Sequence, residues 1–68
     1  MPVYTFAIES GGRPKDDIRW TNLPDRGWAR KHACLIIQEL KQRPEYRDPE
    51  LKMVVKDGDG EVIDIIPF

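Results

Sequence analysis

Apolar and polar residues alternate along the first stretch of the chain. In residues 3–9, Tyr4, Phe6 and Ile8 fall on one face of an extended backbone, and the residues between them fall on the other. The stretch is also rich in the β-branched and aromatic residues that suit a pleated surface. This pattern predicts a β-strand.

A break with two glycines separates this strand from a shorter alternating stretch. In residues 10–14 the glycines permit positive φ, and Pro14 lacks the N–H that a sheet ladder needs, so we expect a turn. Residues 18–21 then predict a short antiparallel strand that returns beside the first. Ile18 and Trp20 are expected to share one of its faces.

The spacing of apolar residues becomes helical near residue 24. Pro24 suits the first helical position, Asp25 can accept hydrogen bonds from free backbone N–H groups, and Pro44 is expected to close the helix. One stripe is expected to face the sheet, and it contains Ala29, Ala33, Ile36, Ile37 and Leu40. Its two alanines would let the helix approach the sheet closely.

The other helix positions are expected to form two further surfaces. Polar and basic residues are expected opposite the apolar stripe, namely Arg26, Arg30, Lys31, Gln38 and Lys41. A second line of residues, spaced by four and three, is expected along one edge of the stripe and consists of Trp28, His32 and Leu35.

Two more extended stretches follow the helix. Residues 51–56 alternate, with Leu51, Met53 and Val55 on one face. The sequence Asp-Gly-Asp-Gly at residues 57–60 predicts a hairpin turn that closes with a left-handed glycine. Residues 61–68 then predict the last strand, in which too many residues are apolar for one face alone. A central position in the sheet, or an outer face covered by another subunit, would explain this.

The order of these elements predicts an α+β fold, ββαββ, with about four antiparallel strands and one helix packed on one face of the sheet. The other face has no second layer to cover it. We expect it to carry Val3, Ala7, Val54 and two of Val62, Ile63, Ile65 and Ile66. Because an apolar face of this kind is rarely left in water, a homo-oligomer through the outer sheet face is expected.

Length and charge limit the possible classes of protein. The 68 residues suffice for one domain, near the lower size at which a chain buries enough apolar surface to fold alone. A formal net charge of −1 gives no overall attraction to nucleic acid. The charge is uneven, however, because residues 25–43 hold five basic and two acidic side chains, whereas residues 44–68 hold three basic and seven acidic ones.

Cysteine content and hydropathy indicate the expected cellular compartment. Cys34 is the single cysteine, so neither an intrachain disulfide nor a cysteine-based zinc site is expected. No stretch approaches the roughly twenty apolar residues of a membrane span. We therefore expect a soluble, unprocessed, cytoplasmic protein that uses no cofactor.

Short matches at several places resemble an uncharacterised family of short bacterial proteins, known as a domain of unknown function. The matching pieces are Met-Pro-x-Tyr-x-Phe at residues 1–6, Leu-Pro-Asp at 23–25 followed by Ala29 and Ala33, Asp-x-Asp-Gly at 57–60 and Ile-Pro-Phe at 66–68. Gly27 and Trp28 depart from the acidic or alanine-rich helix openings of the family. The resemblance implies a compact cytosolic domain and assigns no activity, ligand or catalytic residue.

Residues that could support catalysis or metal binding do not converge. His32 and Cys34 point about 200° apart on a helix, so they cannot act as base and nucleophile together. Asp57, Asp59 and Glu61 have the spacing that begins a calcium loop, but its twelfth position is Phe68 instead of a bidentate glutamate. The sequence therefore predicts no catalytic or metal-binding residue and a protein that is not an enzyme.

Two helix surfaces remain as candidate binding sites. The first, here called the partner edge, consists of Trp28, His32 and Leu35. The second, here called the basic strip, consists of Arg26, Arg30, Lys31, Lys41 and Arg43 and could contact phosphate groups. The sequence predicts a non-enzymatic protein-interaction or structural module. The alternative is a nucleic-acid-binding regulator or antitoxin-like module that uses the basic strip.

Overall fold

A computed structural model describes residues 2–68, except for the side chains of residues 17–19. The chain forms two strands, a helix, a short 3₁₀ turn and two further strands. The elements in chain order are β1 (Val3–Ser10), β2 (Arg13–Asn22), α1 (Arg26–Leu40), η1 (Pro44–Tyr46), β3 (Leu51–Lys56) and β4 (Val62–Pro67). This confirms the expected α+β fold with the order ββαββ.

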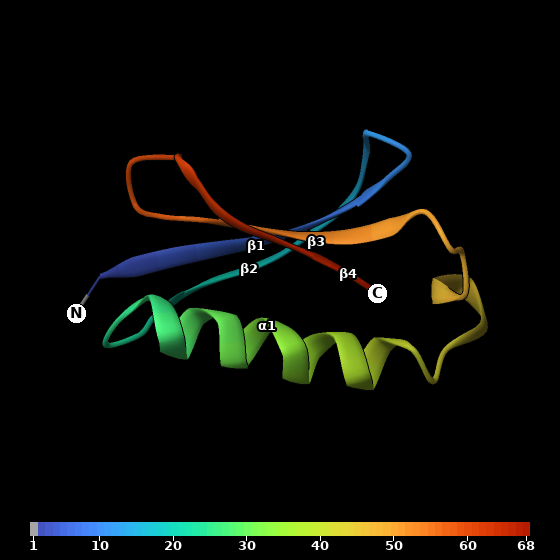
Figure 1. Ribbon diagram of the computed structural model, residues 1–68, viewed down its shortest axis with the longest axis horizontal. Helices are drawn as coiled ribbons and strands as arrows, with labels where there is room; N and C mark the ends of the chain where they lie inside the picture. The colour runs from blue at the N-terminus through green and yellow to red at the C-terminus, as the bar shows by residue number, and fades with distance from the viewer. Residues whose placement is uncertain (1) are drawn as a thin grey trace.

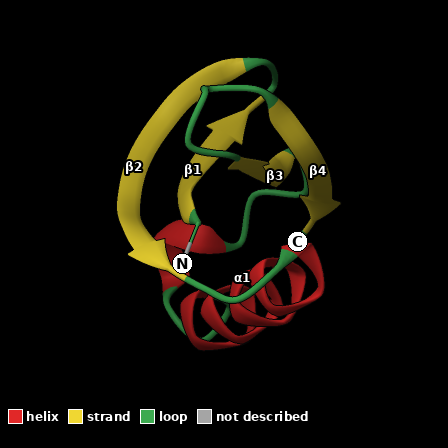
Figure 2. Ribbon diagram, turned by 90° about the vertical axis from the view of Figure 1, so that its left-hand side faces the viewer, coloured by secondary structure: helices red, strands yellow, loops and turns green. Residues whose placement is uncertain are grey.

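The four strands form one antiparallel sheet in the order β2-β1-β3-β4. The first strand of each hairpin lies in the middle of the sheet, because β1 pairs with β3, so β2 and β4 are the edge strands. Helix α1 lies across one face of the sheet, and both hairpin turns bend away from it (Figure 1). Viewed along the helix, β2 and β4 lie on opposite sides of the molecule (Figure 2).

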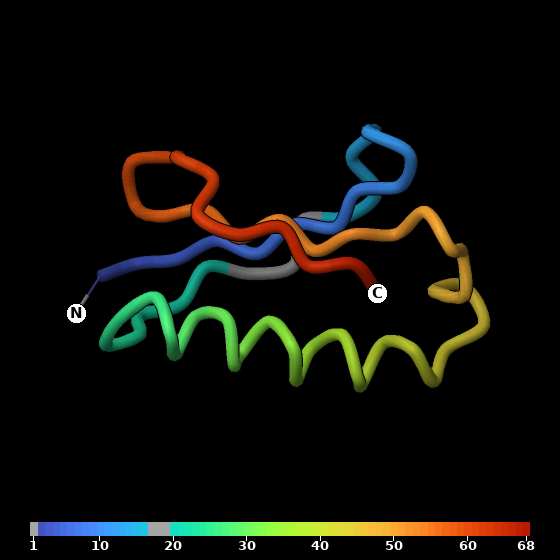
Figure 3. Tube along the Cα trace, in the orientation of Figure 1, coloured from blue at the N-terminus to red at the C-terminus, as the bar shows by residue number. Residues whose placement is uncertain are grey.

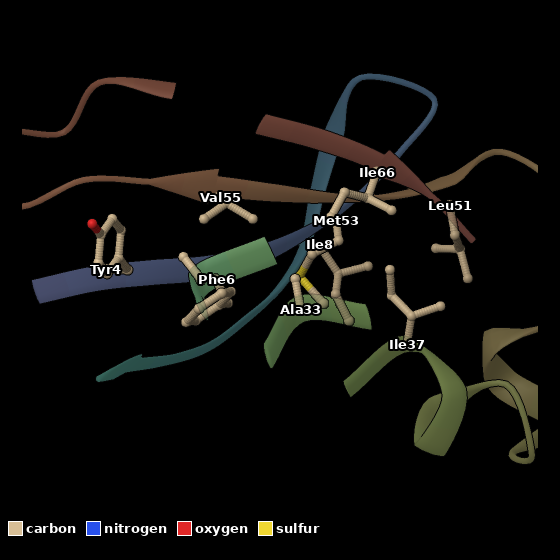
Figure 4. Packing of buried hydrophobic residues seen from close by; sticks show 10 residues of the cluster. Tyr4, Phe6, Ile8, Ala33, Ile37, Leu51, Met53, Val55 and Ile66 are labelled. Atoms are coloured by element: carbon tan, nitrogen blue, oxygen red, sulfur yellow. The ribbon is translucent and has the colours of Figure 1, made fainter. Parts of the chain in front are cut away.

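The core lies between the sheet and α1. One face of β1 and β3 contributes side chains that are almost fully buried, and α1 contributes Ala29, Ala33 and Ile37 (Figure 4). The fully buried large side chains are Phe6, Ile8, Leu51, Met53 and Val55. Both alanines have no exposed surface, which agrees with the expected close approach of helix and sheet.

Strand β2 is longer than the sequence pattern indicated. The expected turn between the first two strands is confirmed, but it is shorter than residues 10–14, and the expectation that Pro14 stays out of the ladder is wrong. Only Gly11 and Gly12, both at positive φ, form the turn. Pro14 pairs with Glu9 inside the ladder, which an edge strand tolerates because a missing N–H there costs little. The expected shared face of Ile18 and Trp20 lies outside the described residues, since the side chain of Ile18 is among those not described.

Helix α1 is shorter than residues 24–43 at both ends. Asp25 is the N-cap, and its Oδ1 accepts a hydrogen bond from the backbone N–H of Trp28 at 3.0 Å. The helix ends at Leu40, and Lys41 caps it through its own backbone N–H. Figure 3 follows the chain from there through η1 into β3.

The connection between α1 and β3 has its own structure. In η1, Tyr46 is half-buried and its ring stacks on Phe68, with centroids 6.5 Å apart. Its hydroxyl donates a hydrogen bond to Asp16 of β2 at 3.3 Å, and burial and the neighbouring carboxylate raise the pKa of Tyr46. This turn therefore links the C-terminus to the edge strand β2.

A bulge explains how β4 accommodates its run of apolar residues. Between the pairs Val55–Asp64 and Lys56–Val62, the register shifts by one residue, so Ile63 is the extra residue. Ile63 packs against the core, and Ile66 is buried beneath the helix. Val62 and Ile65 are the exposed members of the run.

Candidate protein-interaction surfaces

A catalytic or metal centre requires several polar or ionisable side chains that lie close together. No three His, Cys, Asp or Glu side chains among the described residues are grouped so that they could hold a metal ion. His32 and Cys34 lie on different flanks of α1, as their spacing requires. Within the same residues, no helix is both long and apolar enough to cross a membrane.

The positions around α1 can be measured from the buried line formed by Ala29, Ala33 and Ile37. With about 100° per residue, Arg26, Arg30 and Lys41 lie about 20°, 60° and 80° from the centre of this line. The expectation that these three lie opposite the core is therefore wrong. Arg30 and Lys41 occupy one flank of the helix, whereas Arg26 lies in the first turn in line with the buried residues. All three side chains are exposed.

The structure also divides the basic strip by its contacts. Arg30 donates a hydrogen bond to Asp64 of β4, with Nη1 and Oδ2 2.5 Å apart, and the carboxylate raises the pKa of Arg30. Lys31 lies about 160° from the buried line, on the back of the helix, with its Nζ 5.1 Å from the centre of the Trp28 ring. Arg43 follows the end of α1 as the residue before η1. The five basic residues thus do not form one strip.

The partner edge is brought together by the helix. The ring of His32 is half-buried and lies against Phe6 in the core, with centroids 5.1 Å apart. Trp28 and Leu35 project further outwards and are 51% and 61% exposed. His32 is the inner member of this surface, and its contact with Phe6 fixes it to the core.

A third helix surface was missed by the sequence reasoning. Lys31, Leu35 and Glu39 are all exposed, and they lie about 160°, 160° and 120° from the buried line, on its far side. This row, here called the back row, follows the helix axis at intervals of four residues. The same spacing is visible in the sequence, and measuring angles from the alanines would have found it.

The outer sheet face, which lies away from α1, carries the expected residues. Ala7, Val54 and Ile65 are paired across three strands, so their side chains share this face. Val54, at the centre, is only 3% exposed, whereas Ile65 and Val62 on β4 are 54% and 51% exposed. Trp20 on β2 pairs with Thr5, which places it on the same face, and it is 69% exposed.

The two tryptophans lie on separate surfaces of the molecule. Trp20 belongs to the outer sheet face, and Trp28 belongs to the helix on the other side of the sheet. Each is the largest exposed aromatic residue of its own surface. The molecule thus has two separate exposed apolar surfaces.

Comparisons with protein families, with curated proteins and with solved structures each found no match.

Proposed function

We propose that this protein is a non-enzymatic interaction module that binds another protein through an exposed apolar surface. The observation that supports the proposal is the exposure of five large apolar side chains in so small a chain. They are Trp20, Trp28, Leu35, Val62 and Ile65. Grouped apolar side chains of this kind are typical of protein-binding surfaces.

The outer sheet face is the surface that we propose for self-association. Val62 and Ile65 form an apolar border along β4, and Trp20 projects from the opposite edge strand. Val54 lies between them and is already covered by its neighbours, so a second copy would gain contacts at the two borders of the face. Burial of apolar surface is the main driving force of such association.

Sedimentation velocity over a range of concentrations tests this part of the proposal. Ile65→Lys introduces a charge into the border of the outer sheet face and is expected to abolish the contact made there. Glu61→Lys is the matched control, because it adds the same lysine at an exposed position just before β4. If Ile65→Lys and Glu61→Lys associate equally, the outer sheet face is not the surface used.

The cellular location of the protein and its family are also proposals. We propose a cytoplasmic location because Cys34 is a single, half-buried thiol and requires no oxidising compartment. The resemblance to an uncharacterised bacterial family likewise remains a proposal. It is compatible with a protein that acts by binding.

Nucleic-acid binding through the basic strip draws less support. Arg30 is paired with Asp64, and Lys31 lies over the ring of Trp28 on a different side of the helix from Arg26 and Lys41. A protein that tracks a phosphate backbone presents its cations along one surface. Retention on an immobilised polyanion at low salt that falls steeply with added salt, and is lost in Arg26→Glu, would favour this alternative instead.

A further inference from the structure

The back row of α1 places an exposed leucine between two opposite charges. Lys31, Leu35 and Glu39 follow one another at intervals of about one helical turn, and Lys31 and Glu39 are about 12 Å apart along the axis. All three side chains are exposed. Arg30–Asp64 is the only ion pair among the described side chains, so neither Lys31 nor Glu39 pairs within that part of the chain.

The described part of the chain does not cover this side of the helix. Helix α1 forms one outer layer of the molecule, with the sheet entirely on its other side (Figures 1 and 2). Leu35 is 61% exposed and is not part of the core cluster. A second helix could therefore lie along the back row without displacing any other element.

The charges along the back row match those of a second copy of α1 only when the two helices run in one of the two possible relative directions. When a two-fold axis passes beside Leu35, each leucine meets the leucine of the second copy. Lys31 of each copy then lies opposite Glu39 of the other. A parallel pairing would place lysine beside lysine and glutamate beside glutamate, which is unfavourable.

We propose that the back row is an interface at which α1 pairs antiparallel with α1 of a second copy. The contact is isologous, with one Leu35–Leu35 contact on the axis and two Lys31–Glu39 ion pairs beside it. Trp28 lies about one turn before Lys31 in α1. The ammonium group of Lys31 lies near the back row, 5.1 Å from the centre of the Trp28 ring. The proposal does not rest on self-association through the outer sheet face, which lies on the other side of the molecule.

The length of the helix limits the strength of this contact. The 15 residues of α1 span about 22 Å, so the pairing of two such helices buries less than the roughly 800 Å² per partner of a standard interface. The dimer is therefore expected to be weak and to form reversibly with rising concentration.

Charge reversal tests the direction of pairing. Lys31→Glu and Glu39→Lys each place two pairs of like charges across the axis, so each variant alone is expected to lose at least about tenfold in dimer affinity. In a mixture, one variant supplies two glutamates and the other two lysines, so a heterodimer is expected. The double variant Lys31→Glu/Glu39→Lys is expected to dimerise like the native protein. Sedimentation of each sample at low salt, in an Ile65→Lys background that removes association through the outer sheet face, reads out all four cases.

A cysteine at the axis tests the register. Helices about 9 Å apart bring facing Cα atoms to about 4–5 Å, within the span of a disulfide. Leu35→Cys in a Cys34→Ser background is therefore expected to form a covalent dimer on mild oxidation. Gln38→Cys in the same background is the control, because the two copies of residue 38 lie about 9 Å apart along the axis.

The outcomes distinguish this interface from the outer sheet face. Dimerisation that survives Ile65→Lys but is lost when Lys31→Glu is added to that variant supports the back row, whether or not the outer sheet face makes a contact in the native protein. A native protein that stays monomeric at every concentration, or single charge reversals that dimerise as the native protein does, would overturn the proposal. All substituted back-row positions are exposed, and circular dichroism confirms that each variant is folded.

Discussion

The guanidinium group of Arg30 donates a hydrogen bond to the carboxylate of Asp64, which joins the middle of α1 to the edge strand β4. Asp64 lies on the helix-facing side of the sheet, in the same row as Phe6 and Val55. A residue expected on the solvent side of the helix is thus a link between two layers of the fold. The pair also neutralises the one acidic residue of β4.

Removal of this ion pair should lower stability modestly and in a salt-dependent way. Arg30→Ala and Asp64→Asn each break the pair, and in a double-mutant cycle their effects should not add at low salt. The coupling should shrink as salt screens the two charges. Urea unfolding of the four proteins at low and high salt measures it. Equal coupling at both salt concentrations would contradict an ion pair as its origin.

Val54 should behave as a core residue although it lies on the outer sheet face. It is 3% exposed, so Val54→Ala should cost about 1–3 kcal/mol of unfolding free energy through lost burial and a residual cavity. Val62→Ala makes the same chemical change at a half-exposed position and should change stability by less than about 0.5 kcal/mol. Similar losses in the two variants would show that the central position is not covered.

Replacement of Ala33 by a larger residue should lower the free energy of unfolding. Its side chain has no exposed surface between α1 and the sheet, so Ala33→Leu forces the two layers apart and should cost about 1–3 kcal/mol. Gln38→Leu adds a leucine at an exposed position of the same helix and should have little effect on the unfolding free energy. Chemical denaturation at low protein concentration compares them. A stable Ala33→Leu variant would contradict the close approach.

The carboxylate of Asp48 should make a measurable contribution to stability at acid pH. Its Oδ1 accepts a hydrogen bond from the backbone N–H of Glu50 at 2.8 Å, and its Oδ2 accepts one from the hydroxyl of Ser10 at 2.7 Å. These bonds favour the charged form and lower the pKa of Asp48 below its usual 3.8. The contribution is therefore fully present above about pH 4 and is lost as pH falls through the lowered pKa.

The variant Asp48→Asn isolates this contribution. It should be less stable than the native protein at neutral pH, and the difference should shrink as pH falls below about 4. Urea midpoints at several pH values provide the measurement. Asp59→Asn is the control, because within the described residues Asp59 makes a side-chain hydrogen bond only through its backbone N–H, which donates to Asp57 Oδ1, and its own carboxylate accepts none. A difference that stays constant down to the lowest pH would exclude the carboxylate as its source.

Local sequence patterns were sufficient to predict the strands, the helix and most of the core residues. The alternation that includes Tyr4, Phe6 and Ile8 predicts both the strand and its buried face, because side chains alternate on any strand. The alanines of α1 likewise identify the side that faces the sheet. The pattern was not sufficient for Pro14, since only the position of β2 at the edge of the sheet makes a proline acceptable in the ladder.

The candidate surfaces were harder to predict from the sequence than the strands, the helix and the core, because they depend more on the tertiary structure. The sequence by itself determined that Trp28, His32 and Leu35 lie close together, because helical periodicity fixes which residues are neighbours along a helix. Only the tertiary structure decided that Arg30 meets Asp64, that Val54 is covered and that Trp20 and Trp28 lie on different sides of the sheet. The physical reason is that periodicity sets direction relative to one element, whereas burial and pairing depend on strand order and on bulges, which bring together residues far apart in the chain.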